Sequence, residues 1–203
     1  MMETQVVSTV SRRTVFDFEV YVLMTMKFRL SMTSDPVMKG RLATKLADYG
    51  LTVADGERIH AQITEVLVDE DLFFRNLQAF FDVDTGGAQE VSCASVLWPE
   101  FDFKATADAS GRLQSARYWH VRRSAARPQF ESPRDVPTWS MDLEGFTEHF
   151  GPLNPSLHRP LFDEHLPNYE EHQFDWIDEY GLTRDYGAGF CWGLFIFVGE
   201  SWD

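Results

Sequence analysis

Three histidines and the carboxylates around them are the residues of this chain whose types could support catalysis or metal binding. The histidines are His158, His165 and His172, seven residues apart, and the carboxylates nearby are Asp163, Glu164, Glu170 and Glu171. Histidine and carboxylate can act together as general acid and base, and both bind divalent metals. On one helix the imidazoles would lie two turns, about 10 Å, apart, and prolines at 160 and 167 interrupt any such helix. A hydrolase with a His–carboxylate or metal site therefore remains an alternative that requires folding to bring these side chains together.

Motifs that specify a reaction are absent from the sequence. It contains no phosphate-binding Gly-x-x-x-x-Gly-Lys loop, no His-Glu-x-x-His pair, no Cys-x-x-Cys pair and no Gly-x-Ser-x-Gly turn. The glycines of residues 187–193 precede an apolar run that is typical of a strand, whereas a dinucleotide loop precedes a helix. We interpret these glycines as a turn with close strand packing. We predict no catalytic residue, no metal ligand and no cofactor.

The acidic and aromatic segment at the carboxyl end is the strongest candidate for a binding surface. Residues 161–203 contain ten carboxylates and one Lys or Arg, namely Arg184. We predict a helix over about 168–180, on which Glu171, Asp175 and Asp178 share one face. On that helix Phe174 and Ile177 would face the core. The predicted partner-binding residues are Tyr169, Glu170, Glu171, Asp175, Trp176, Asp178, Glu179 and Tyr180.

Residues 111–134 form the opposite, basic pole, with six arginines and one carboxylate. Arginine interleaved with aromatic residues suits phosphates and stacked bases, but it also suits carboxylates of the same chain or of a partner. The net charge of −14 opposes direct binding to nucleic acid, which we therefore do not expect. The secondary basic patch consists of Arg117, Trp119, Arg122 and Arg123.

Length and composition indicate one globular domain. The chain has 203 residues, 44% of them hydrophobic, so a self-sufficient core is available. We predict a single α+β domain over 1–203, with a helical block at about 35–83 and the acidic-aromatic segment at 161–203. Two distant cysteines, no signal-like start and a longest apolar run too short to span a bilayer favour a cytoplasmic protein that does not bind membranes.

Periodicity predicts the elements that position these segments. Apolar residues occupy every even position from Phe16 to Met32, which predicts a long strand with one buried face. Three helices are predicted at 35–83, starting at Asp35, Asp55 and Asp69. The fold class is then α+β, an antiparallel or mixed sheet with a long N-terminal strand and helices packed mainly on one face.

The remaining elements follow from turn signals. Residues 89–123 are predicted as strands, with a hairpin turn at 108–112. A short helix is predicted after Ser140, irregular structure at 152–167 because of its prolines, and a last strand at 189–198.

The leading hypothesis is a non-enzymatic, acidic protein-binding module that engages a basic surface of a partner. One form of it is an inhibitor or nucleic-acid mimic directed at a nucleic-acid-handling complex, of the phage or plasmid anti-defence type. A structural subunit that pairs through the edge of the N-terminal strand is a further alternative to the hydrolase. The leading hypothesis requires that the carboxylates near the carboxyl end stay exposed and are not neutralised by the arginines of 112–134.

Overall fold

The computed structural model describes residues 10–32, 36–83, 87, 89–121, 130–177 and 180–200. A helical block is followed by antiparallel strands, which confirms the predicted α+β class. In chain order the elements are α1 (Arg12–Thr25), α2 (Lys27–Met32), α3 (Pro36–Ala47), α4 (Val53–Leu67), α5 (Phe73–Phe80), β1 (Glu90–Ala94), β2 (Phe101–Ala107), β3 (Leu113–His120), the 3-10 turn η1 (Pro133–Asp135), α6 (Leu143–Phe150), β4 (Asn154–Arg159), β5 (Tyr169–Ile177), β6 (Thr183–Cys191) and β7 (Leu194–Glu200).

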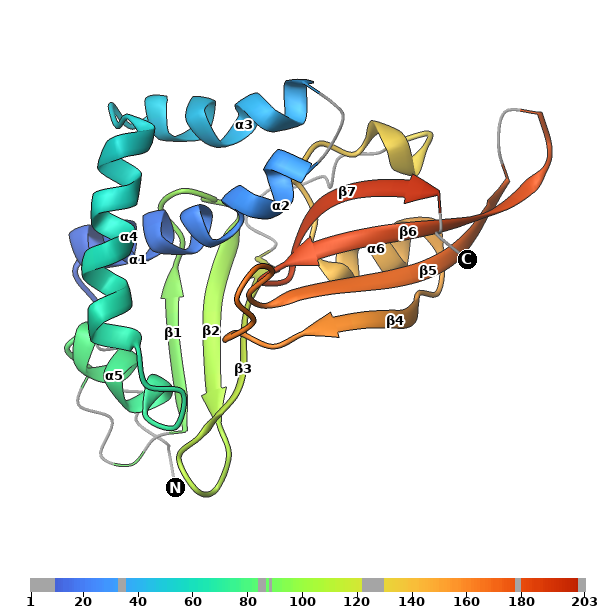
Figure 1. Cartoon of the computed structure of the whole chain (residues 1–203). Helices are drawn as coiled ribbons and strands as arrows, with labels where there is room; N and C mark the ends of the chain where they lie inside the picture. Colours follow the sequence, from blue (N-terminus) through green and yellow to red (C-terminus); the bar gives the residue numbers. More distant parts are fainter. Residues whose placement is uncertain are drawn as a thin grey trace.

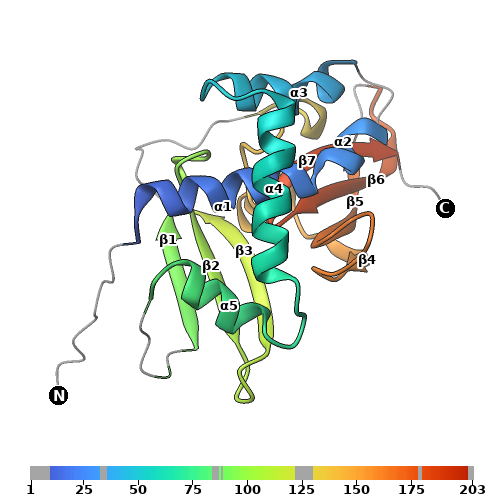
Figure 2. The same cartoon turned by 60° about the vertical axis from the view of Figure 1, so that its left-hand side comes forward.

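The strands form two antiparallel sheets, one in the order β1-β2-β3 and one in the order β4-β5-β6-β7. Helices α1, α4 and α5 lie on one face of the first sheet, and α6 lies behind the second sheet (Figures 1 and 2). The first sheet shares its apolar core with these helices, and a smaller core lies between α6 and the second sheet. The two sheets therefore do not merge into the one sheet that the sequence predicted.

The predicted N-terminal strand over 16–32 is wrong, because these residues form α1 and α2. Every residue from Phe18 to Met24 is buried, so α1 is covered on all sides and shows no amphipathic stripe. The Phe18 ring, for example, lies 4.9 Å from the Phe103 ring of β2. The apolar residues at even positions have the period of a strand, and this led to the wrong prediction. Several odd positions in the same helix are equally buried. The structural-subunit alternative loses the strand on which it depended.

Glu19 is the one charged residue between Phe18 and Met24 of α1. Its carboxylate caps the turn that follows β1. Its Oε2 accepts the backbone N–H groups of Val96 and Leu97 at 2.8 and 2.7 Å. Its side chain is fully buried, at 0% exposure. Burial raises the pKa of Glu19, and this outweighs the hydrogen bonds from Ser95, Leu97, Val96 and Tyr118, which lower it. The carboxyl group therefore holds a loop of the first sheet against the central helix.

The helical block at 35–83 is confirmed as α3, α4 and α5, with changes in capping. Thr52, rather than Asp55, is the N-cap of α4, since its hydroxyl accepts the N–H of Asp55 and the Asp55 carboxylate accepts the N–H of Thr52. Asp69, predicted as the cap of the third helix, is not its N-cap: Leu72 holds that position, and the Asp69 carboxylate accepts the N–H groups of Asp71 and Leu72 in the turn before α5. Asp35 lies outside the described residues.

The hairpin turn at 108–112 is also confirmed. The Asp108 carboxylate accepts the backbone N–H groups of Ser110 and Arg112 and so closes the turn between β2 and β3. The short helix predicted after Ser140 is present as α6, but its N-cap is Asp142, whose Oδ1 accepts the N–H of Gly145 at 2.8 Å.

The predicted helix over 168–180 is wrong, because residues 169–177 form strand β5 between β4 and β6. Phe174 packs against the Phe146 ring of α6, as expected of a core residue, but Ile177 is exposed rather than buried. The segment 152–167, predicted as irregular, contains β4. The last strand, predicted at 189–198, is two strands, β6 and β7, joined by a turn at Trp192 and Gly193. Packing between neighbouring strands determines which secondary structure these segments adopt. The periodicity of a single segment does not reveal that packing.

The turn between β6 and β7 connects the two sheets. Trp192 is fully buried, its Nε1 donates to the Thr25 hydroxyl of α1 at 2.9 Å, and its carbonyl accepts the N–H of Tyr118 in β3 at 2.7 Å. Both turn residues have positive φ, 52° at Trp192 and 78° at Gly193. A Cβ at Gly193 would lie 2.8 Å from the carbonyl oxygen of Tyr118, so glycine is required there. This confirms the interpretation of residues 187–193 as a turn with close packing.

Replacing Glu19 with alanine is expected to lower the free energy of unfolding by about 2–4 kcal/mol, since each buried N–H left without an acceptor costs about 1–3 kcal/mol. The donors concerned are those of Val96 and Leu97. Urea unfolding at pH 7 measures the loss. The matched control is Glu19→Gln, which keeps an acceptor oxygen and is expected to lose much less. Equal losses in the two variants would contradict the capping role.

Glu19 also predicts a pH dependence that Glu19→Gln should remove. Because burial raises the folded-state pKa of Glu19 above the ordinary value of 4.5, protonation of this carboxyl favours the folded chain. That stabilisation is complete below pH 4.5 and is lost as the pH rises through the raised value. The stability of the wild type relative to Glu19→Gln should therefore fall as the pH increases from 4 to 8. A constant difference over that range would show that the carboxyl titrates normally.

Candidate functional site

The predicted partner-binding residues lie on a strand, so they point to two opposite faces. In β5, Glu171 and Asp175 share one face and Glu170 and Trp176 share the other. The single helical face predicted for Glu171, Asp175 and Asp178 therefore does not exist. Asp178 and Glu179 lie outside the described residues.

Glu170, at the inner end of β5, is held by charges of the same protein. Its side chain is largely buried, and its Oε2 lies 3.3 Å from Nε2 of His172. Burial raises the pKa of Glu170, but the hydrogen bond with His172 and the charges of Arg117, His172 and His158 outweigh it, so the pKa is lowered. Arg117 belongs to the basic segment of the sequence, so its charge helps to stabilise the ionised form of Glu170.

Tyr169 and Glu171 also interact within the fold. Tyr169 is 1% exposed, so it is a core residue and not the surface anchor that the sequence suggested. Its hydroxyl donates to Oε2 of Glu171 at 2.8 Å. The guanidinium of Arg29, from α2, lies 3.9 Å from the centre of the Phe197 ring and 5.2 Å from that of Tyr169. A Cβ at Gly189 would lie 2.7 Å from the Tyr169 hydroxyl, so the glycine leaves room for this cluster.

The outer end of β5 differs, because its carboxylate faces another carboxylate. Asp175 is paired directly across the ladder with Asp185 of β6, and both are exposed. The pKa of Asp185 is raised, because its carboxyl group shares a hydrogen bond with Asp175 and is repelled by its charge. Like charges directly opposite in a sheet are destabilising.

Apolar side chains surround this carboxylate pair at the tip of the hairpin. Ile177, Tyr180 and Leu182 are 63%, 77% and 55% exposed. Trp176 is partly buried, with its ring 5.4 Å from the Phe150 ring of α6, so it anchors the hairpin to the body. We name residues 174–177 and 180–186 the distal ribbon. Ile177, Leu182 and Asp185 were missed as site residues, although Gly181 between two alternating runs is a turn signal that could have identified the hairpin.

The structure describes only two of the four residues of the secondary basic patch, Arg117 and Trp119. Arg117 is exposed and Trp119 half-buried on β3, and the Lys104 ammonium lies 5.8 Å from the centre of the Trp119 ring. Lys104 also pairs with Glu90 of β1. Arg122 and Arg123 lie outside the described residues.

The three histidines do not converge on one site. His158 is exposed on β4, His172 is buried against the Phe190 ring, and His165 lies against the Phe28 ring of α2. In the described ranges, no group of three or more His, Cys, Asp or Glu side chains is arranged to hold a metal ion. Burial raises the pKa of the Cys93 and Cys191 thiols to about 12, so neither is an activated nucleophile.

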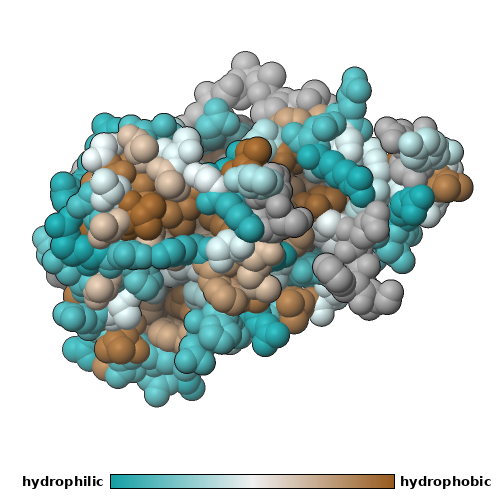
Figure 3. Space-filling model, turned by 45° about the horizontal axis from the view of Figure 1, so that its top comes forward, coloured by the Kyte–Doolittle hydropathy of each residue, from teal (hydrophilic) through white to brown (hydrophobic). Residues whose placement is uncertain are grey.

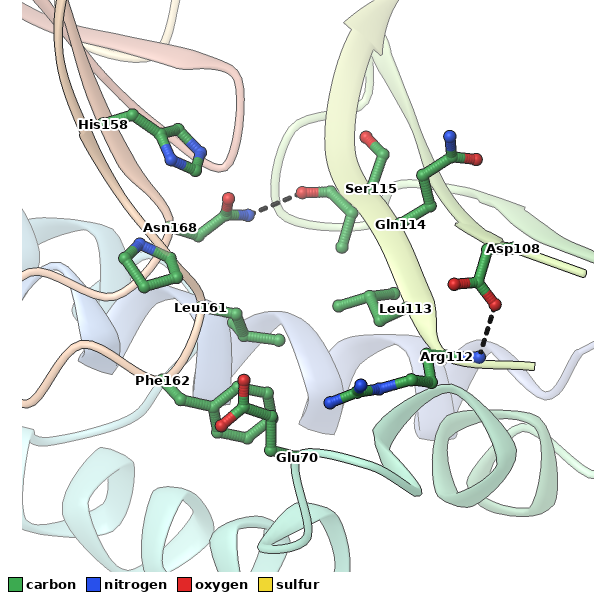
Figure 4. Close-up of a pocket in the computed structure, with 12 residues that line it drawn as sticks. Glu70, Asp108, Arg112, Leu113, Gln114, Ser115, His158, Leu161, Phe162 and Asn168 are labelled. Carbon is green, nitrogen blue, oxygen red and sulfur yellow. Dashed lines mark hydrogen bonds between the residues drawn. The ribbon is translucent and has the colours of Figure 1, made fainter. Parts of the chain in front are cut away.

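A pocket of about 350 Å³ lies between β3 and the chain that follows β4 (Figure 4). His158 stands at one side of it and Ser115 and Gln114 at the other, while Arg112 extends toward the side where Glu70 and Phe162 lie. Arg112 pairs with Asp71, and Asn168 donates to the carbonyl of Ala116. The Asn168 hydrogen bond joins β3 to the chain before β5, and the Arg112 ion pair joins the β2–β3 turn to the segment before α5. No hydrogen bond between a nucleophile and a base is found among these lining residues.

The chain matches no protein family model, no curated protein and no solved structure. Among the described residues, no helix is long and apolar enough to cross a membrane.

The Asp175–Asp185 pair predicts that Asp185→Asn stabilises the distal ribbon at neutral pH. The raised folded-state pKa of Asp185 means that a stabilisation present below its ordinary value of 3.8 is lost as the pH rises. Amide hydrogen exchange in residues 174–177 should therefore be slower in Asp185→Asn than in the wild type at pH 7, and equal at pH 3. Glu65→Gln, which removes an exposed charge from α4, is the control for net charge. Unchanged exchange at pH 7 would show that the two carboxylates do not repel each other.

Proposed function

We propose that this protein is a non-enzymatic binding module that engages a basic surface of a partner protein through the distal ribbon. The observation that carries the proposal is the exposed carboxylate pair Asp175–Asp185 framed by the exposed apolar side chains of Ile177, Tyr180 and Leu182. Apolar anchors beside charges of one sign are the composition of a protein interface, in which the charges steer the encounter and the anchors give affinity.

The projection of the hairpin supports this role. Strand β4 pairs with β5 as far as Gln173, and β7 pairs with β6 from Tyr186 onward. Beyond these residues, in the described strands, 175–177 and 183–185 pair with each other alone. Figure 1 shows β5 and β6 extending past β4 and β7 at one end of the molecule, and Figure 3 shows apolar atoms at that end. A two-stranded ribbon is marginally stable by itself in water, so a partner that covers it would also order it.

Charge indicates the class of partner. Residues 174–186 hold four carboxylates and one arginine, and the whole chain has a net charge of −14. A cation placed at Asp175 and Asp185 would relieve their mutual repulsion, which gives a basic partner a gain that a neutral one lacks. Proteins that handle nucleic acid carry such basic surfaces, so we propose a partner of that class and an inhibitory or regulatory role. The inner carboxylates Glu170 and Glu171 contribute less, because they are engaged within the fold.

We further propose that the protein acts in the cytoplasm. Cys93 and Cys191 are both free thiols, which is the usual state of cysteine in a reducing compartment.

Reversing the charges of the pair tests the proposal. Immobilised wild-type protein is incubated with a cell extract at low salt, washed, and eluted at about 1 M salt, where the Debye length falls to about 3 Å. Asp175→Lys combined with Asp185→Lys should retain at most about a tenth of the basic proteins that wild type retains. A variant with serine at Ile177, Tyr180 and Leu182 should be similarly weakened, since interface anchors each contribute more than about 1 kcal/mol.

The matched control is Glu65→Lys, which changes charge on the exposed face of α4 and should bind as wild type does. Retention of the same proteins by the ribbon variants and by wild type would refute the proposal. Wild-type retention that survives high salt would refute the electrostatic part of it.

A further inference from the structure

Strand β1 is a free edge of the first sheet. Its odd residues face β2, because Ser95 and Gln89 at its two ends form backbone hydrogen bonds with Phe101 and Ala107. The even residues, Ser92 and Ala94 among them, therefore direct one N–H and one C=O each away from the sheet. In the described part of the chain, no group forms a hydrogen bond with these backbone atoms.

The other sheet edges, β3, β7 and β4, either form hydrogen bonds with the rest of the chain or are interrupted. On β3, the N–H of Tyr118 donates to Trp192 and the carbonyl of Ala116 accepts from Asn168. On β7, Phe195 forms backbone hydrogen bonds with Trp139 and Met141. Strand β4 is interrupted by Pro155 and a register shift, devices that block edge pairing. Strand β1 has neither a proline nor a register shift.

A groove of about 640 Å³ runs beside this edge. Its floor is formed by Ser92 to Val96. The remaining lining residues are Val10 just before α1, Arg12 and Val15 of α1, Tyr49, Pro99 and Asp102. The Tyr49 hydroxyl donates to the carbonyl of Val96 at 2.8 Å and so fixes one wall. The edge groups lie about 6.6 Å apart, twice the rise of a strand, which is the spacing that another strand requires. A helix satisfies its own backbone groups and would leave these unpaired.

We propose that this groove binds an extended segment of a basic partner protein, which adds to the first sheet as a strand beside β1. Backbone hydrogen bonds to Ser92 and Ala94 would supply affinity, and the Asp102 carboxylate would accept a basic side chain. Val10 and Val15 would favour small or β-branched side chains at alternate positions. A second copy of this chain is a poor occupant, since each copy carries a net charge of −14. A positively charged partner is favoured by the same charge. The groove is separate from the distal ribbon, and the inference does not depend on the function proposed for it.

Hydrogen exchange of the free, full-length protein is the first test. The amides of Ser92 and Ala94 should exchange on the order of a hundredfold faster than those of Val91 and Cys93, which pair with β2. Slow exchange at Ser92 and Ala94 in a monomer would overturn the proposal, because the chain itself would then cover the edge. Slow exchange that depends on concentration, with a dimer by light scattering, would assign the edge to a second copy and also overturn it.

Selection from a display library of random peptides of about eight residues is the second test, since strands of this length are typical. Selected peptides should be rich in Lys or Arg and should slow exchange at Ser92 and Ala94. They should bind Ser92→Pro at least about tenfold more weakly than wild type, because proline removes an outward N–H that β2 does not use. Ser92→Thr keeps that N–H and is the matched control.

Unchanged exchange at Val91 and Cys93 shows that the Ser92→Pro chain is folded, and Ala94→Pro provides a second blocking variant. Failure to select any peptide, or equal binding to wild type and both proline variants, would overturn the proposal. Enrichment of acidic peptides would contradict the charge assigned to the partner.

Discussion

The contact of Trp192 with α1 and β3 is the interaction on which the rest of the structure depends. Its indole is buried between the central helix and the first sheet, and its hydrogen bonds reach Thr25 and Tyr118. The same residue forms the turn between β6 and β7, so the second sheet is fixed by it at one end. Because the distal ribbon is the other end of β6, its direction of projection follows from where this turn is anchored. Glycine at 193 is what allows the turn to approach Tyr118 so closely.

The elements that the sequence predicted well are those whose signals are local. The helices from 36 to 80 each carry apolar residues at helical spacing, α4 also has a capping box, and the β2–β3 turn is closed by a single aspartate, Asp108. The failures occurred where tertiary packing decides. Helix α1 is buried on all sides, so its apolar residues carry no helical period. Residues 169–177 have a central position between two strands, which no local pattern reveals.

Composition indicated the candidate surface near the carboxyl end, but the helical geometry predicted for it is wrong. An acidic and aromatic segment near the carboxyl end was correctly identified as unusual, but the strand divides its residues between two faces. Arg117 and Glu170 are far apart in sequence and interact electrostatically in the fold. The number of charges in each segment suggests such an interaction but does not show which residues form it. The exposed acidic surface is therefore smaller than the sequence implied. Within the described strands β5 and β6, it is limited to the outer half of the hairpin, where Asp175 meets Asp185.

The position of α1 in the chain has a consequence for synthesis of the protein. Helix α1 is synthesised before both sheets, yet the Thr25 hydroxyl receives its hydrogen bond from a residue 167 positions later. Until that residue is made, the mainly apolar stretch from Phe18 to Met24, which is buried in the folded protein, lacks part of its cover. Contacts so distant in sequence form late, and the intermediates present during translation are therefore aggregation-prone. Nascent chains of this protein should therefore be clients of chaperones that hold apolar segments, and truncations before Trp192 should accumulate as aggregates.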